Sequence, residues 1–97
     1  MKNITFEWNA SKALANKKKH KVSFEEAKSA FLDENALVIH DPEHSHDEDR
    51  FILLGLSITS RVLVVCHCYR EKDSTIRIIS ARKATKKESI QYGGDYL

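Results

Sequence analysis

Four apolar-rich runs, separated by turns or polar loops, follow one another in the second part of the chain, and this series constrains the fold more than any other feature. The runs span residues 36–40, 50–58, 61–69 and 75–82. The connections at 59–60 and 71–74 are short enough for hairpins, and strands joined in this way pair with each other. Residues 75–81 alternate and are β-branched, which is typical of a strand. The series predicts an antiparallel meander.

The N-terminal part predicts one short strand and two helices. Residues 6–8 alternate apolar and acidic side chains, and Asn9 then stands where it can cap a helix that runs to about His20. Residues 23–26 fit a capping box, and apolar residues recur after it at helical spacing. Because Leu14, Phe24 and Phe31 need a surface on which to be buried, we expect both helices to cover one face of a twisted antiparallel sheet. This is an α+β arrangement, and its opposite face would have room for a ligand.

Composition indicates one small domain over residues 1–97, since 97 residues with 41% hydrophobic content suffice for a single core. The longest apolar run, 62–66, is far too short to cross a bilayer, and the N-terminus lacks a signal-peptide pattern. We therefore expect a cytoplasmic protein without a membrane partner. Cys66 and Cys68 are poorly placed to pair with each other and are expected to be reduced.

Charge is distributed unevenly behind the formal net charge of +2. Residues 12–21 hold five lysines and no acid, whereas residues 41–49 hold five carboxylates and no Lys or Arg. The basic segments indicate an electrostatic footprint for nucleic acid, and a solvated lysine face is the alternative.

A second basic segment lies where the last strand leads into a helix. Arg77, Arg82, Lys83, Lys86 and Lys87 occur within eleven residues, with no carboxylate before Glu88. Thr85 and Glu88 fit a capping box, which places the start of the helix beside these charges. Because the amides of a helix N-terminus add partial positive charge, the junction predicts a phosphate site.

A series of short motifs extends over nearly the whole chain: Phe6-Glu7-Trp8-Asn9, Lys12, Asn16, the lysines that end in His20, Val22-Ser23-Phe24-Glu25-Glu26-Ala27, Asp41, His44-Ser45, Arg50-Phe51, Gly55 and Arg77-Ile78-Ile79-Ser80-Ala81-Arg82. Together, in this order and spacing, they resemble the BrnT family of bacterial toxins. The resemblance implies a RelE-like fold and a ribonuclease toxin of a type II toxin–antitoxin system. It also implies a BrnA-like antitoxin with a ribbon-helix-helix DNA-binding domain.

RNA cleavage without a metal needs cations for the phosphorane charge, a base for the ribose 2′-hydroxyl and an acid for the leaving oxygen. Arg77 and Arg82 are candidates for the first role, because the planar guanidinium binds two phosphate oxygens. Strand parity separates their faces unless a bulge intervenes or Arg82 lies beyond the strand end, and we favour the second case. Salt bridges to Glu7 or Glu48 are the alternative for Arg77.

His20 is the candidate base and Lys19 the candidate acid or phosphate-neutralising group. The pKa of a histidine lies near neutrality, and the neighbouring lysines would tend to lower it. As an alternative, His20 simply caps the carbonyls at the end of its helix. The remaining basic residues are expected to bind RNA: Lys12, Lys17, Lys18, Lys83 and Lys86.

No cofactor and no metal is expected. The histidine-rich loop at 40–49 carries ligand types that suit zinc, but its spacing matches no closed four-ligand site, so a turn at Asp41-Pro42 with the remainder solvated is the simpler interpretation. Two rival function classes stay open, namely a non-catalytic basic module that binds RNA or protein and a metal-dependent enzyme that uses this loop.

The expected partners are an RNA substrate and the BrnA-like antitoxin. A heterotetramer of two toxins and two antitoxins is expected, which would touch DNA only through the antitoxin.

Overall fold

The structure, a computed structural model, describes residues 4–44 and 48–93. Its elements follow the order expected from the sequence, with one additional short 3-10 helix. They are β1 (Thr5–Glu7), α1 (Ala10–His20), α2 (Phe24–Ala30), β2 (Leu37–His40), η1 (Pro42–His44), β3 (Phe51–Leu56), β4 (Val62–Arg70), β5 (Thr75–Lys83) and α3 (Lys86–Gly93). None of the helices in these two ranges has the length and apolar character of a membrane span.

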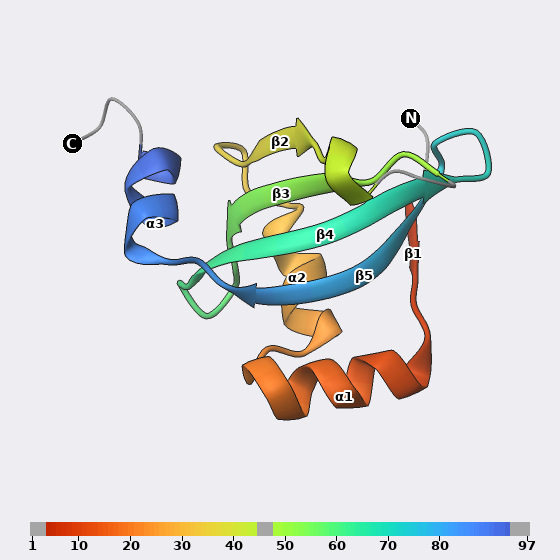
Figure 1. The fold of residues 1–97 in the computed structure, drawn as a ribbon, viewed down its shortest axis with the longest axis horizontal. Coiled ribbons are helices and arrows are strands. Elements are labelled where there is room, and N and C mark those ends of the chain that lie inside the picture. The colour runs from red at the N-terminus through yellow and green to blue at the C-terminus, as the bar shows by residue number, and fades with distance from the viewer. Residues whose placement is uncertain (1–3, 45–47, 94–97) are drawn as a thin grey trace.

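The strands form one five-stranded sheet in the order β1-β5-β4-β3-β2 (Figure 1). Strands β2 to β5 are the antiparallel meander that the short connections predict. β1 instead pairs in parallel with the beginning of β5, so the sheet is mixed rather than wholly antiparallel. The α+β class is confirmed. β1 can pair in parallel with β5 because the two strands are far apart in the sequence, with two helices and three other strands between them.

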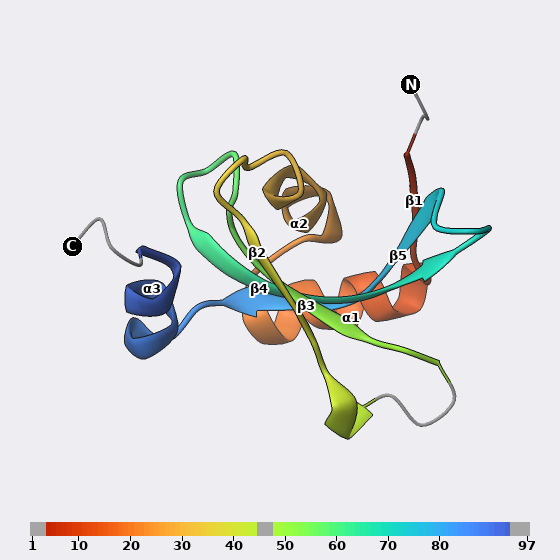
Figure 2. The ribbon, with the colours of Figure 1, turned by 90° about the horizontal axis from the view of Figure 1, so that it is seen from above.

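The main core lies between α2 and one face of the sheet, which we call the helix face (Figures 1 and 2). Phe24, Ala27 and Ala30 of α2 are buried against it. The sheet residues of this core are Leu53, Leu63, Val65, Ile78 and Ala81. α1 lies along β5 and contributes Ala13 at the margin of the core. The expectation that Leu14 is buried was wrong, because its side chain is 74% exposed.

Asn16 of α1 closes the outer edge of β5. β1 pairs only with residues 75–77, so within the described residues no strand lies beside the rest of β5 on that side. Asn16 accepts a hydrogen bond from the Ala81 amide at 3.1 Å and donates one to the Ala81 carbonyl at 2.8 Å. Its amide also donates to the Val22 carbonyl at 2.9 Å. One buried side chain thus replaces a neighbouring strand and anchors α1.

The N-terminal caps of the first two helices form as expected, with one difference. Asn9 accepts from the Lys12 amide and Ser23 from the Glu26 amide. Glu26, however, does not return to Ser23 as a full capping box requires. Its carboxylate accepts instead from Arg61 and from the hydroxyls of Ser57 and Thr59. A carboxylate forms a stronger hydrogen bond with a charged guanidinium than with a neutral backbone amide. Glu26 therefore binds Arg61 and links α2 to the β3–β4 turn.

Candidate functional site

A β-bulge in β5 places the two candidate arginines on the same face of the sheet. Cys66 pairs with Ser80 and His67 with Ile78, so Ile79 is the extra residue and the register shifts there. The shift reverses the parity of the strand, and Arg77 and Arg82 therefore both lie opposite the helix face. The expectation that Arg82 lies beyond the strand end was wrong, since β5 continues through Lys83.

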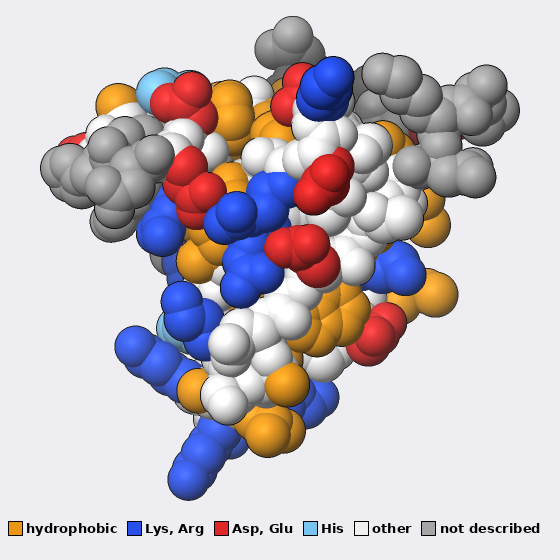
Figure 3. Space-filling model, turned by 90° about the vertical axis from the view of Figure 1, so that its right-hand side faces the viewer, with side chains coloured by type: hydrophobic (Ala, Val, Ile, Leu, Met, Phe, Trp, Pro, Cys, Tyr) orange, Lys and Arg blue, Asp and Glu red, His pale blue; other side chains and the backbone are white. Residues whose placement is uncertain are grey.

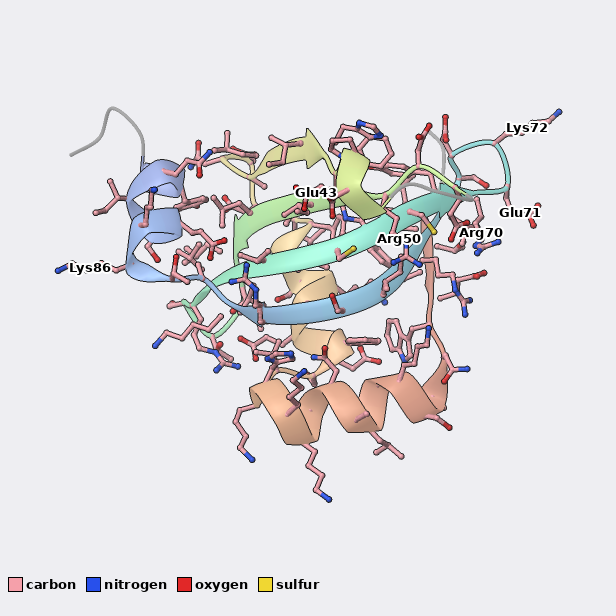
Figure 4. The ribbon with its side chains drawn as sticks, viewed as in Figure 1. Glu43, Arg50, Arg70, Glu71, Lys72 and Lys86 are labelled. Atoms are coloured by element: carbon pink, nitrogen blue, oxygen red, sulfur yellow. The ribbon has the colours of Figure 1, made fainter. Side chains whose placement is uncertain are left out.

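The face opposite α1 and α2, which we call the open face, carries a shallow depression of about 260 Å³. Arg82 and Ser80 from β5 line it together with Cys66 from β4 and Arg50, which directly precedes β3. Its other lining residues are Asp41, Ile52, Val64 and Ile79. Figure 4 shows Arg50 over this face of the sheet. Burial raises the pKa of the Cys66 thiol, so this group stays protonated and does not oppose an anion.

Arg82 is held at one end of this open-face depression by Glu88 from α3. The two guanidinium nitrogens donate to the two carboxylate oxygens at 2.8 and 2.9 Å. Glu88 also accepts from the Thr85 amide, and its own amide donates to the Thr85 hydroxyl, so this capping box forms completely. The hydrogen bonds from Arg82 are the main cause that holds the pKa of Glu88 at about 2. The positive charge that the sequence placed at this junction is thus balanced within the chain.

Arg77 belongs to a different cluster at the other end of β5. It donates to Glu7 at 2.8 Å, and Arg70 lies between Glu7 and Glu48. Figure 3 shows acidic and basic side chains interspersed over this end of the molecule. Arg82 lies five positions after Arg77 in the strand, a span of roughly 16 Å at about 3.3 Å per residue. The salt bridge considered for Arg77 is present, and the two arginines do not converge on one phosphate.

The last turn of α1 brings its basic residues to the same end of the molecule as Arg82. α1 runs beside β5 in the same direction, with Asn16 level with Ala81. His20 lies one helical turn, roughly 6 Å, beyond Asn16 and is therefore level with Lys83. Lys19 is exposed and His20 half-buried. Lys21, and not His20, caps this helix end, because its amide donates to the Lys17 carbonyl and its ammonium to the Lys18 carbonyl.

We call this region the basic end: Lys17, Lys18, Lys19, His20, Lys83 and Lys86. All its members except His20 are exposed. Lys86 points away from the sheet in Figure 4. Lys12 lies in the first turn of α1, at the opposite end of that helix, and is not part of this cluster.

The histidine-rich loop is only partly described, because Ser45, His46 and Asp47 lie outside the described residues. Asp49 lies 3.3 Å from the ring of His40. No group of three metal-ligand side chains occurs among the described residues. His67 is fully buried on the helix face against Phe31, whereas Cys66 lines the open face, so their side chains alternate along β4.

Two site residues were not recognised from the sequence. Arg50 entered the sequence analysis only as part of the resemblance. Once β3 is known, strand alternation places its side chain on the same face as Ile52, which is the open face that carries Arg82. Glu88 was interpreted only as a capping residue. Glu88 follows Arg82 by six residues, and the end of a strand and the first turn of the next helix bring residues at this spacing together. The sequence could therefore have predicted the ion pair.

The fold and this face together define a small α+β protein whose sheet carries an open depression lined by Arg50 and Arg82. The family model for the ribonuclease toxin BrnT of type II toxin–antitoxin systems matches residues 8–88. The chain belongs to this BrnT toxin family.

A crystal structure of the Brucella abortus ribonuclease toxin BrnT, at 1.1 Å resolution, has the same fold. It covers 87% of this chain and 100% of its own, with a TM-score of 0.66 and 19% sequence identity. The search of curated proteins gave no match.

Proposed function

We propose that this chain is a metal-independent endoribonuclease that arrests growth by cutting RNA in the cytoplasm, as a single toxin domain over residues 1–97. The observation that carries the proposal is the position of Arg82 in an open depression, beside Arg50 and next to the basic end. Such an arrangement suits a polyanion, because the guanidinium groups can bind one phosphate while the lysines bind neighbouring phosphates along the RNA backbone.

The roles follow from the chemistry of attack by the 2′-hydroxyl on the adjacent phosphate. Arg82 stabilises the additional charge of the phosphorane, a role that typically contributes about 3 kcal/mol to lowering the barrier. His20 accepts the proton of the 2′-hydroxyl, and Lys19 neutralises the phosphate or protonates the leaving 5′-oxygen. Arg77, which Glu7 holds at the far end of β5, supports the fold or the RNA path rather than the reacting phosphate.

The products of cleavage test the mechanism. Attack by the 2′-hydroxyl leaves a cyclic 2′,3′-phosphate and a 5′-hydroxyl, so purified protein should yield these ends and retain its rate in EDTA. A substrate with 2′-deoxyribose at the cut position should resist. The variant Arg82→Ala should cut roughly 100-fold more slowly, as expected when one oxyanion contact is lost. Lys72→Ala, in the β4–β5 turn, is the matched control and should cut at the normal rate.

Products with a 5′-phosphate, or loss of activity in EDTA, would contradict the mechanism. A metal-dependent enzyme that uses the histidine-rich loop would give the second result. A non-catalytic RNA-binding module, the remaining alternative, would bind RNA without producing new ends. The exposed lysines of the basic end are the observation that favours this second candidate.

Membership of a type II family implies an antitoxin partner. We propose that this partner is a BrnA-like ribbon-helix-helix protein, that two toxins and two antitoxins form a heterotetramer, and that only the antitoxin contacts operator DNA.

A further inference from the structure

We infer that Glu88 is a built-in competitor of the RNA phosphate at Arg82. The carboxylate occupies a cradle that consists of the Arg82 guanidinium and the Thr85 amide. This inference rests on the proposed function, since it concerns how access to the same depression is controlled.

The geometry of the cradle is that of an oxyanion site. A guanidinium binds a carboxylate and a phosphate through the same pair of parallel N–H···O hydrogen bonds. Glu88 uses both terminal nitrogens of Arg82, and one of them also lies 3.4 Å from the Lys83 carbonyl. The pair of terminal N–H groups is therefore already engaged, and a phosphate that enters the depression must displace Glu88 to bind this pair.

Displacement is feasible because the pair is not deeply buried. The side chains of Arg82 and Glu88 are 41% and 29% exposed. Once released from Arg82, the carboxylate can rotate toward solvent and be hydrated. Ion pairs as exposed as this one contribute little to stability, so breaking it costs little. The competition is permanent near neutral pH, since the pKa of Glu88 lies at about 2.

Release of Glu88 would also loosen α3. The complete capping box at Thr85 depends on the same carboxylate, and α3 has no buried residue of its own. At its other end the Tyr92 hydroxyl donates to Asp33 at 2.6 Å, which holds the helix to the β3 side of the sheet. Occupation of the cradle by RNA would therefore exchange one contact of the first turn of α3 while its last turn remains attached.

Binding of a 2′-O-methyl RNA oligonucleotide tests the inference without depending on cleavage. Glu88→Gln should bind this probe about three- to tenfold more tightly than the unchanged chain, because the competing charge is removed. Glu25→Gln is the matched control: it makes the same change in net charge at an exposed position of α2 and should tighten binding less than twofold. The gain should disappear when Arg82→Gln is combined with Glu88→Gln.

Thr85→Ala separates the effect of the charge from that of helix loosening. It weakens the cap but leaves the Arg82–Glu88 pair in place, so it should not tighten binding. If Glu88→Gln binds no better than Glu25→Gln, or if Thr85→Ala gives the same gain, the inference is overturned. Failure of the unchanged chain to cut RNA, with the Glu88 effect on binding intact, would reject the proposed catalysis and leave the competitor in place.

Discussion

Asn16 shows how one side chain determines the position of a helix that supplies site residues. It is 8% exposed and makes three hydrogen bonds to backbone groups of Ala81 and Val22. A buried backbone group without a hydrogen-bond partner destabilises the folded state. Asn16 therefore couples the packing of α1 to the edge of β5. The same coupling places His20 and Lys19 level with Lys83.

We predict that Asn16→Ala lowers the free energy of unfolding by about 2–4 kcal/mol, since three buried backbone groups lose their partners. Asn16→Asp should cost at least as much, because an acceptor would then face the two carbonyls. Urea denaturation measures both, with Lys17→Ala at the exposed neighbouring position expected to stay within about 0.5 kcal/mol. A cost below 1 kcal/mol for Asn16→Ala would show that water or a shift of α1 replaces these bonds.

At the level of elements, the β3–β4 turn is fixed to α2 by a charge. The Glu26 side chain is 10% exposed and accepts from Arg61 together with Ser57 and Thr59. The hydrogen bond from Arg61 is the main cause that lowers the pKa of Glu26 to about 2, against the opposing effect of burial. Ser60, with a φ of 64°, completes the tight turn between the strands.

We predict that Glu26→Gln lowers the free energy of unfolding by about 2 kcal/mol at pH 7. The pKa is depressed in the folded state, so the stabilisation is fully present above about pH 4.5 and is lost as the pH falls toward 2. The difference between the two proteins in urea denaturation should shrink across that window. Glu25→Gln, on the exposed side of α2, should show little difference at any pH. A difference that stays constant down to pH 3 would contradict the assignment to this carboxylate.

The comparison between sequence and structure separates local signals from distant ones. Alternation and short turns located β2 to β5, and Asn9 and Thr85 located the starts of α1 and α3, because these patterns depend on residues a few positions apart. The bulge at Ile79 leaves no such pattern in the sequence. Strand alternation alone therefore placed Arg82 beyond the strand end, whereas the bulge brings it to the face of Arg77 within the strand. The Glu26 carboxylate accepts a hydrogen bond from Arg61, 35 residues away in the sequence, instead of returning to the nearby Ser23 amide. Pairing of β1 with β5 and the face that Arg50 shares likewise depend on contacts between distant segments.

Among the described residues, charge is divided between the basic end and an opposite end, shown in Figure 3, where acids and arginines neutralise each other. An inhibitor of a basic RNA-binding surface is most effective when it covers that surface with complementary charge, which also accelerates its capture of newly made toxin. The antitoxin implied by the family should therefore pack against the open face and the basic end. Occlusion, rather than a change in the toxin fold, is the expected mode of inhibition.

We predict that charge reversal at Lys18, Lys19 or Lys83 weakens binding of the BrnA-like antitoxin, because each removes an exposed cation from the covered surface. The loss should diminish as salt is raised, since exposed charges are screened within roughly 10 Å at 0.1 M. Reversal at Lys72, in the β4–β5 turn far from the basic end, is the control and should leave the affinity unchanged. Isothermal titration at two salt concentrations measures these effects. The toxin alone should also fail to shift its promoter DNA specifically, whereas the complex should do so through the antitoxin dimer. Specific operator binding by this chain alone, or equal losses at Lys72 and Lys19, would overturn the division of labour between the two proteins.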